Sequence, residues 1–125
     1  MRDDYDPLSF LVIGEGIHVH KRLGPDLLES AYEECLGWRL LRCGIRVRRQ
    51  VVMPLVFEGY RIRAAYRVDM IVAEQLIVEI KCVERFLPVH EAQLRTYLRM
   101  SGLKVGLLFN FKTAVLKDGI RRITV

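Results

Sequence analysis

The sequence predicts a single α/β domain in which two helices precede three or four strands, and a third helix separates these from two further strands. Three observations support this fold class. The chain has 125 residues, the usual length of one domain, so we treat residues 1–125 as a unit. Its residues are 51% hydrophobic, which is enough to form a core. The spacing of the apolar residues also changes along the chain between the helical and the strand period.

The first part of the chain predicts two helices. Asp6 and Pro7 are typical of a helix start, because aspartate caps the first turn and proline suits its first position. The Gly-Pro pair at 24–25 ends this helix. A second helix is expected over residues 26–43, where apolar side chains recur at intervals of three and four. These side chains are Leu27, Leu28, Ala31, Tyr32, Cys35, Leu36 and Leu40.

The middle of the chain has the alternation and composition of strands. The expected strand segments are 45–48, 51–57, 66–72 and 76–81. A turn at Glu58-Gly59 separates the second segment from the third. The third helix begins at Pro88 and ends at 101–102. A buried strand at 105–109 and a last strand at 120–125 complete the order.

The charge balance makes nucleic acid a candidate partner. Lys and Arg number 20 against 15 Asp and Glu, a net charge of +5. Most of the cations are arginines, whose planar fork matches phosphate oxygens. The candidate phosphate-binding side chains are Arg46, Arg48, Arg49, Arg95 and Arg99. A basic surface without such a partner is the alternative, and the first three arginines can equally protect an edge strand from pairing.

The sequence gives little support for secretion, for a membrane span or for a zinc site. The N-terminus is acidic and lacks an apolar core, so we expect no signal peptide. No stretch approaches the ~18 apolar residues of a membrane span, so we expect no membrane partner. The three cysteines form no Cys-x-x-Cys pair, which disfavours a zinc site and indicates reduced thiols. We therefore expect a cytoplasmic protein.

A pair of carboxylates on neighbouring strands is the strongest chemical signal. If the turn after residue 72 centres on Glu74, Asp69 lies directly opposite Glu79, and Lys81 shares the face of Glu79. Opposed carboxylates repel each other, and a hard cation such as Mg²⁺ or Mn²⁺ removes that penalty. A lysine beside the ion can orient a water molecule. These groups suit phosphodiester hydrolysis, and a salt bridge of Lys81 on a solvated strand is the alternative.

The other face of the same two strands is uniformly apolar and is expected in the core. It consists of Val68, Met70 and Val72 against Leu76, Val78 and Ile80.

At this point the sequence resembles a known family. Asp69 followed by Glu79-Ile80-Lys81 resembles the signature of the PD-(D/E)XK nuclease superfamily. Residues 24–32, GPDLLESAY, resemble the hallmark of the small bacterial GxxExxY proteins of that superfamily, and the likeness extends over roughly residues 8–123. The name-giving glycine falls at position 26, where this chain has Asp26. We expect this aspartate to cap the second helix and to disturb the fold little.

The resemblance implies a restriction-endonuclease-like core, with a central mixed β-sheet flanked by helices. It also implies a nuclease that uses Mg²⁺ or Mn²⁺ and acts on DNA or RNA. Glu29 would be the helix acid that holds the metal directly or through water, and Asp69 and Glu79 would be the main ligands. The Ile80 backbone carbonyl would be a third ligand, and Lys81 would position the attacking water.

Two residues of the third helix join this expected site. Gln93 and Tyr97 match a Gln-x-x-x-Tyr pattern of the recombination-nuclease branch, and their spacing alone puts both on one helix face. Glu29 can instead be an exposed helix residue, and Glu33 one turn later can mimic it.

Three functions follow from these observations. The first is a metal-dependent nuclease, and the second is a catalytically silent nuclease-fold module that binds nucleic acid or a protein partner. The third is a hydrolase of some other phosphorylated substrate. A nuclease of this length has no separate recognition domain, and the apolar stretch 51–57 could serve a homodimer.

Overall fold

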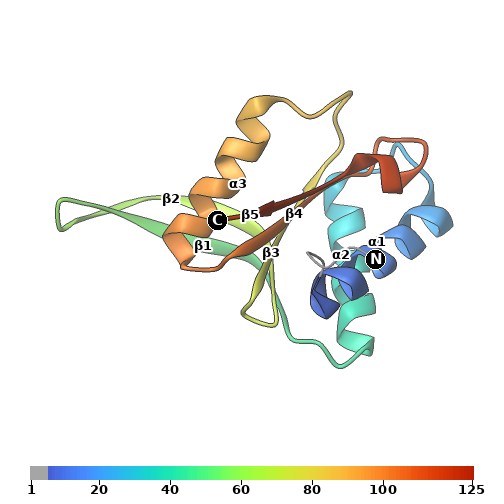
Figure 1. Cartoon of the computed structure of the whole chain (residues 1–125), viewed down its shortest axis with the longest axis horizontal. Helices are drawn as coiled ribbons and strands as arrows, with labels where there is room; N and C mark the ends of the chain where they lie inside the picture. Colours follow the sequence, from blue (N-terminus) through green and yellow to red (C-terminus); the bar gives the residue numbers. More distant parts are fainter. Residues whose placement is uncertain (1–5) are drawn as a thin grey trace.

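The computed structural model describes residues 6–125, without the side chains of residues 63–65. Within these residues the chain forms three α-helices and one five-stranded sheet (Figure 1). The elements in order are α1 (Pro7–Leu23), α2 (Glu29–Arg42), β1 (Val47–Phe57), β2 (Tyr60–Val72), β3 (Leu76–Lys81), α3 (Pro88–Ser101), β4 (Val105–Asn110), a 3₁₀ turn (Leu116–Gly119) and β5 (Ile120–Thr124). This order confirms the predicted α/β class and gives three strands before α3.

The sheet is mixed, with the strands in the order β1-β2-β3-β4-β5. β3 and β4 are parallel, whereas the other neighbouring pairs are antiparallel. A parallel pair needs a crossover connection, and α3 supplies it. The central mixed sheet flanked by helices is therefore confirmed.

Two cores lie on opposite faces of the sheet, one beneath α1 and α2 and the other beneath α3 (Figure 1). The first core includes Val12, Val19, Leu36, Met70, Val78 and Phe109. The second includes Met53, Val68, Ile71, Ile77, Leu94, Tyr97 and Leu98. β3 is buried on both faces, which explains its nearly continuous apolar sequence.

α1 begins as the sequence predicts. The Asp6 carboxylate accepts a hydrogen bond from the Ser9 backbone N–H (2.7 Å), and Pro7 occupies the first turn. The same carboxylate also accepts a hydrogen bond from Arg122 (3.0 Å) on β5. The cap of the first helix is therefore tied to the last strand.

The start of α2 differs from the prediction. The helix begins at Glu29, and its N-cap position is Leu28, so Asp26 does not cap it. Asp26 instead has a φ of 74°, a left-handed conformation that cannot continue into a right-handed helix. Glycine suits such a position best, although aspartate adopts it more readily than most residues. The Tyr32 hydroxyl closes this turn by accepting a hydrogen bond from the Leu27 N–H (3.1 Å).

β1 and β2 form a longer hairpin than expected. The strands meet at the predicted turn, Glu58-Gly59, but β2 begins at Tyr60 rather than at residue 66. The end of this hairpin projects from the body of the molecule as a two-stranded arm (Figure 1). Several large apolar side chains of the hairpin are exposed: Val52, Val56, Phe57, Tyr60 and Tyr66.

At a left-handed residue in the middle of β1, the hairpin twists so that the side chains before and after it lie on opposite faces of the sheet. Gln50 has a φ of 53° and falls opposite Asp69 in the register, between the pairs Arg49↔Met70 and Val51↔Val68. Met70 packs under α1 and α2, whereas Val68 packs under α3. The prediction that Val68 shares a face with Met70 was therefore wrong, because the strands turn over at this point.

Candidate active site

The two predicted carboxylates meet where β2 and β3 run side by side. The paired residues Met70↔Val78, Ile71↔Ile77 and Val72↔Leu76 confirm the predicted register. Beyond these pairs, hydrogen bonds from backbone N–H groups to side chains replace the backbone hydrogen bonds between the two strands. The Asp69 N–H donates to Glu79 Oε2 (2.8 Å), and the Ile80 N–H donates to Asp69 Oδ2 (2.8 Å). Each carboxylate is therefore held by the backbone of the opposite strand.

This arrangement disfavours a negative charge on Glu79. The residue is only 3% exposed, and burial, followed by the charge of Asp69, raises its pKa to about 8. The Lys81 ammonium group lies 3.7 Å from Glu79 Oε1 and partly opposes this shift. In the absence of a cation, Glu79 therefore favours its protonated form at neutral pH.

The donor set suits a small, hard cation. One oxygen of each carboxylate accepts a backbone N–H, which leaves Asp69 Oδ1 and Glu79 Oε1 with longer contacts of 3.5 Å to Gln50 and 3.7 Å to Lys81. No three Asp, Glu, His or Cys side chains within residues 6–125 gather closely enough to hold a metal by themselves. Mg²⁺ keeps several waters and commonly uses one or two carboxylates, so the pair fits it.

Glu33 is the acid of α2 that reaches this pair. It is 5% exposed, and it accepts hydrogen bonds from Gln50 Nε2 (2.7 Å) and Arg49 Nε (2.9 Å). Gln50 Nε2 also lies 3.5 Å from Asp69 Oδ1 and so links the two acids. Burial is the main cause of a raised pKa of Glu33, and the charge of Asp69 adds to it. The hydrogen bonds from Arg49 and Gln50 lower this pKa and only partly oppose the shift.

Glu29 lies elsewhere. It is exposed at the first turn of α2, and its Oε2 accepts a hydrogen bond from the backbone N–H of Cys82 (3.0 Å), just beyond the end of β3. Of the two helix acids considered in the sequence, the structure therefore brings Glu33 to the pair. Gln50 was not anticipated. The signal that could have found it, its position opposite Asp69, depends on the register of β1.

Gln93 and Tyr97 come from the other side of the sheet and join the same site. Tyr97 is 3% exposed and hydrogen-bonds the Gln93 side chain. Burial, followed by the charges of Glu79 and Asp69, raises the pKa of Tyr97 to about 12. Its ring also contacts that of Tyr66, with centroids 5.8 Å apart. Tyr97 thus remains a protonated hydroxyl facing the carboxylates.

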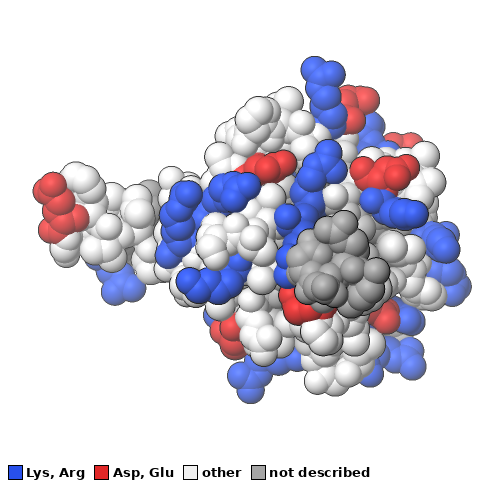
Figure 2. Space-filling model, in the orientation of Figure 1, with Lys and Arg blue, Asp and Glu red and all other residues white. Residues whose placement is uncertain are grey.

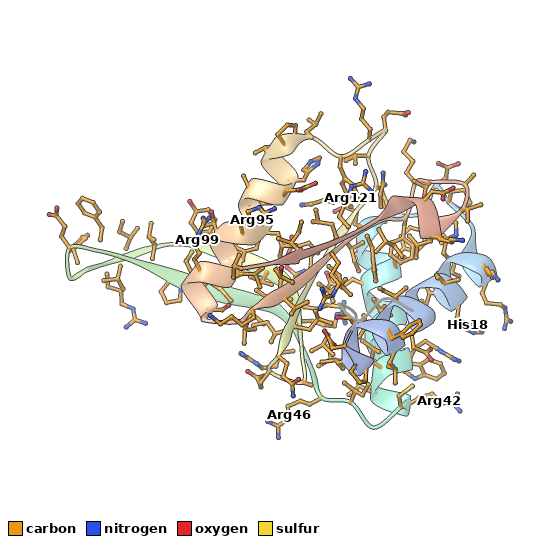
Figure 3. All side chains as sticks on the ribbon, viewed as in Figure 1. His18, Arg42, Arg46, Arg95, Arg99 and Arg121 are labelled. Atoms are coloured by element: carbon orange, nitrogen blue, oxygen red, sulfur yellow. The ribbon has the colours of Figure 1, made fainter. Side chains whose placement is uncertain are left out.

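The arginines of β1 are partly neutralised. Arg49 pairs with Glu33, and Arg48 forms two hydrogen bonds to Glu74 (2.7 and 2.9 Å). Arg46 is exposed just before β1 (Figure 3). Their expected contact with nucleic acid stays a prediction.

Arg95 and Arg99 do not lie beside Gln93 in space. Successive helix residues are rotated by about 100°, so two positions along the helix reach nearly the opposite side. Leu94 and Leu98 face the sheet, which leaves Gln93 on one flank of α3 and Arg95 on the other. The expected contact of Arg95 and Arg99 with nucleic acid stays a prediction, on the flank of α3 away from Gln93.

The fold places the chain among the α/β proteins with a restriction-endonuclease-like core, and its central strands carry the aspartate and the Glu-x-Lys pattern. A family model described as the PD-(D/E)XK nuclease superfamily matches residues 6–123, and the chain belongs to this superfamily. The finer resemblance to GxxExxY proteins stays a prediction. No curated protein and no solved structure matches the chain. Within residues 6–125, no helix is long and apolar enough to cross a membrane.

Proposed function

We propose that this protein is a divalent-metal-dependent nuclease that hydrolyses phosphodiester bonds in DNA or RNA. The observation that carries the proposal is the opposed pair of Asp69 and Glu79, held by reciprocal backbone hydrogen bonds with Lys81 beside it. A purely structural role for this pair is costly, because the burial of Glu79 and the charge of Asp69 both disfavour the ionised form of Glu79. The membership of the superfamily supports the same conclusion.

Asp69 and Glu79 would hold Mg²⁺ or Mn²⁺ through their less engaged oxygens, and the Ile80 carbonyl is the proposed third ligand. When bound, the ion would neutralise the pair and stabilise the negative charge that develops on the phosphate. Glu33, linked to Asp69 through Gln50, takes the role proposed for the helix acid in place of Glu29.

Lys81 is the residue proposed to act on the attacking water. Its side chain is 19% exposed, so it reaches solvent while its ammonium group stays 3.7 Å from Glu79. An ammonium group held in this way can donate a hydrogen bond to the water and to a phosphate oxygen, which orients the attack. Tyr97 and Gln93 enclose the site from α3, where the protonated Tyr97 hydroxyl is available to donate a further hydrogen bond.

Cleavage assays with substituted proteins test the proposal. Labelled single- and double-stranded DNA and RNA would be incubated with Mg²⁺ or Mn²⁺ and the wild type, Asp69→Ala or Lys81→Ala. We expect each substitution to lower kcat by at least about 10²-fold, as loss of a preorganised charged group does elsewhere. Asp118→Asn, an exposed change remote from the pair, is the control and should cleave normally.

Two results would contradict the proposal. Activity that survives either substitution in a folded protein would exclude this mechanism. A wild type that binds nucleic acid but cleaves none of the substrates with either metal would favour the silent binding module instead. Circular dichroism of every variant shows whether the fold is retained.

A further inference from the structure

A cavity lies at the N-terminal end of α3, on the flank of the helix that faces away from the carboxylates. Its volume is about 450 Å³, and its lining includes Phe86, Glu91, Arg95 and Arg121. Arg121 comes from β5 and places its guanidinium 5.3 Å from the centre of the Phe86 ring. Two cations and one aromatic ring therefore line the same cavity as a single carboxylate.

The arginines on this flank are less neutralised than three arginines of α2 and β1. Arg39, Arg48 and Arg49 each have a guanidinium nitrogen within 2.9 Å of a carboxylate oxygen. By contrast, Arg95 lies 3.9 Å from Glu91, and Arg99 and Arg121 meet no carboxylate within residues 6–125. Their positive charge is therefore available to a ligand.

Arg95 and Arg121 line the same cavity, and Arg99 lies one helical turn after Arg95. Figure 3 shows Arg95 and Arg99 on α3 with Arg121 nearby on β5, and Figure 2 shows Lys and Arg side chains gathered over the same elements. We call Arg95, Arg99 and Arg121 the α3–β5 patch. A row of arginines beside a half-buried aromatic ring matches the sugar–phosphate backbone of nucleic acid, because guanidinium groups bind phosphate oxygens bidentately.

We propose that the α3–β5 patch binds the substrate backbone away from the scissile bond. This inference rests on the proposed nuclease function, because it takes the bound nucleic acid to be the substrate. A helix with its side chains is about 10–12 Å wide, so the patch and the carboxylates contact different phosphates of one strand. The patch therefore adds affinity for a polymer without touching the reacting phosphate.

A binding experiment without cleavage tests the patch. Fluorescence anisotropy would measure the binding of a labelled oligonucleotide to Asp69→Asn protein in EDTA across a range of salt concentrations. Arg95→Gln/Arg121→Gln should weaken binding at least about 10-fold at low salt and reduce the salt slope by about two, because each arginine neutralises one phosphate. The matched control is Arg22→Gln/Arg42→Gln, which removes the same charge from α1 and α2.

The control decides between a site and a general charge effect. Equal losses in the two double variants would overturn the proposal, as would displacement of the oligonucleotide by inorganic phosphate alone. If the wild type is active, the patch substitutions should raise KM for a long substrate more than they lower kcat. If the wild type cleaves nothing, the proposed function fails, but the anisotropy comparison still decides whether the patch binds nucleic acid.

Discussion

Glu33 and Gln50 show how single residues complete the site. Gln50 adopts a left-handed conformation that costs a non-glycine residue roughly 1–2 kcal/mol, and its amide thereby reaches both Glu33 and Asp69. Strain of this kind persists only where the surroundings impose it, and it is common at functional sites. The amide donates to both acids, so it fixes their separation.

We predict that Glu33→Gln impairs the site and that Glu29→Gln does not. Glu33 is coupled to Asp69 through Gln50, whereas Glu29 contacts only the backbone of Cys82 among its hydrogen-bond partners in residues 6–125. Loss of a partner that orients a ligand typically lowers metal affinity or activity about 10–100-fold. Calorimetric titration with Mn²⁺ would compare the two variants with the wild type. A larger loss of Mn²⁺ affinity for Glu29→Gln than for Glu33→Gln would show that Glu29 is the metal-holding acid, as the resemblance implies.

The predictable part of the site is the part that is local in sequence. Asp69, Glu79 and Lys81 belong to one hairpin, so counting residues from the turn was enough to pair them. Glu33 and Gln50 depend on how α2 and β1 pack against that hairpin, which no local pattern specifies. The cap at Asp26 failed for a similar reason, because the left-handed turn is held by Tyr32 farther along the chain.

At the scale of elements, α3 packs closely on β4 at a glycine. A Cβ atom at Gly106 would lie 2.8–2.9 Å from three side-chain atoms of Leu94, which is fully buried. The absence of a side chain therefore lets the crossover helix approach the sheet.

Two glycine substitutions should change stability in opposite directions. Gly106→Ala would force Leu94 to move within a packed core, and we expect it to lower the free energy of unfolding by about 1–3 kcal/mol. Gly14→Ala in α1 meets no atom within 4 Å and should raise it by about 0.5–1 kcal/mol through helix propensity. Urea denaturation would measure both. Equal effects would show that α3 does not depend on this contact.

Strand lengths were less predictable than strand positions. β1 has a left-handed residue at Gln50 and a shift of register between Met53 and Leu55, next to Pro54. Each interruption breaks the alternation by which strands are recognised, so one strand of the structure corresponds to two segments in the sequence. The start of β2 lies in the projecting arm, where little burial marks the strand.

At the scale of the whole molecule, the acidic pair makes stability depend on pH. The pKa of Glu79 is raised to about 8 from an ordinary value of 4.5, so the folded state holds this proton more tightly than the unfolded chain. The stabilisation is complete below the ordinary pKa and is lost as the pH rises through about 8. The raised pKa of Glu33 acts in the same direction.

We therefore predict that the Tm of the protein in EDTA falls between about pH 5 and pH 8. Glu79→Gln cannot lose a proton and should reduce this dependence, whereas Glu58→Gln at the exposed hairpin turn should not. Mg²⁺ should restore stability at the higher pH if it occupies the pair. Differential scanning calorimetry provides the comparison, and an unchanged slope in Glu79→Gln would assign the effect to other groups.

The hydrogen bond between Asp6 and Arg122 joins positions that are 116 residues apart. During synthesis the ribosome completes α1 and α2 long before it produces the arginine that ties the first helix to the sheet. The apolar face of these helices also packs against Phe109 and Phe111, which are made late. The apolar surface of these helices is therefore not fully covered until both phenylalanines have emerged, and α1 is tied to β5 only after residue 122 has left the exit tunnel.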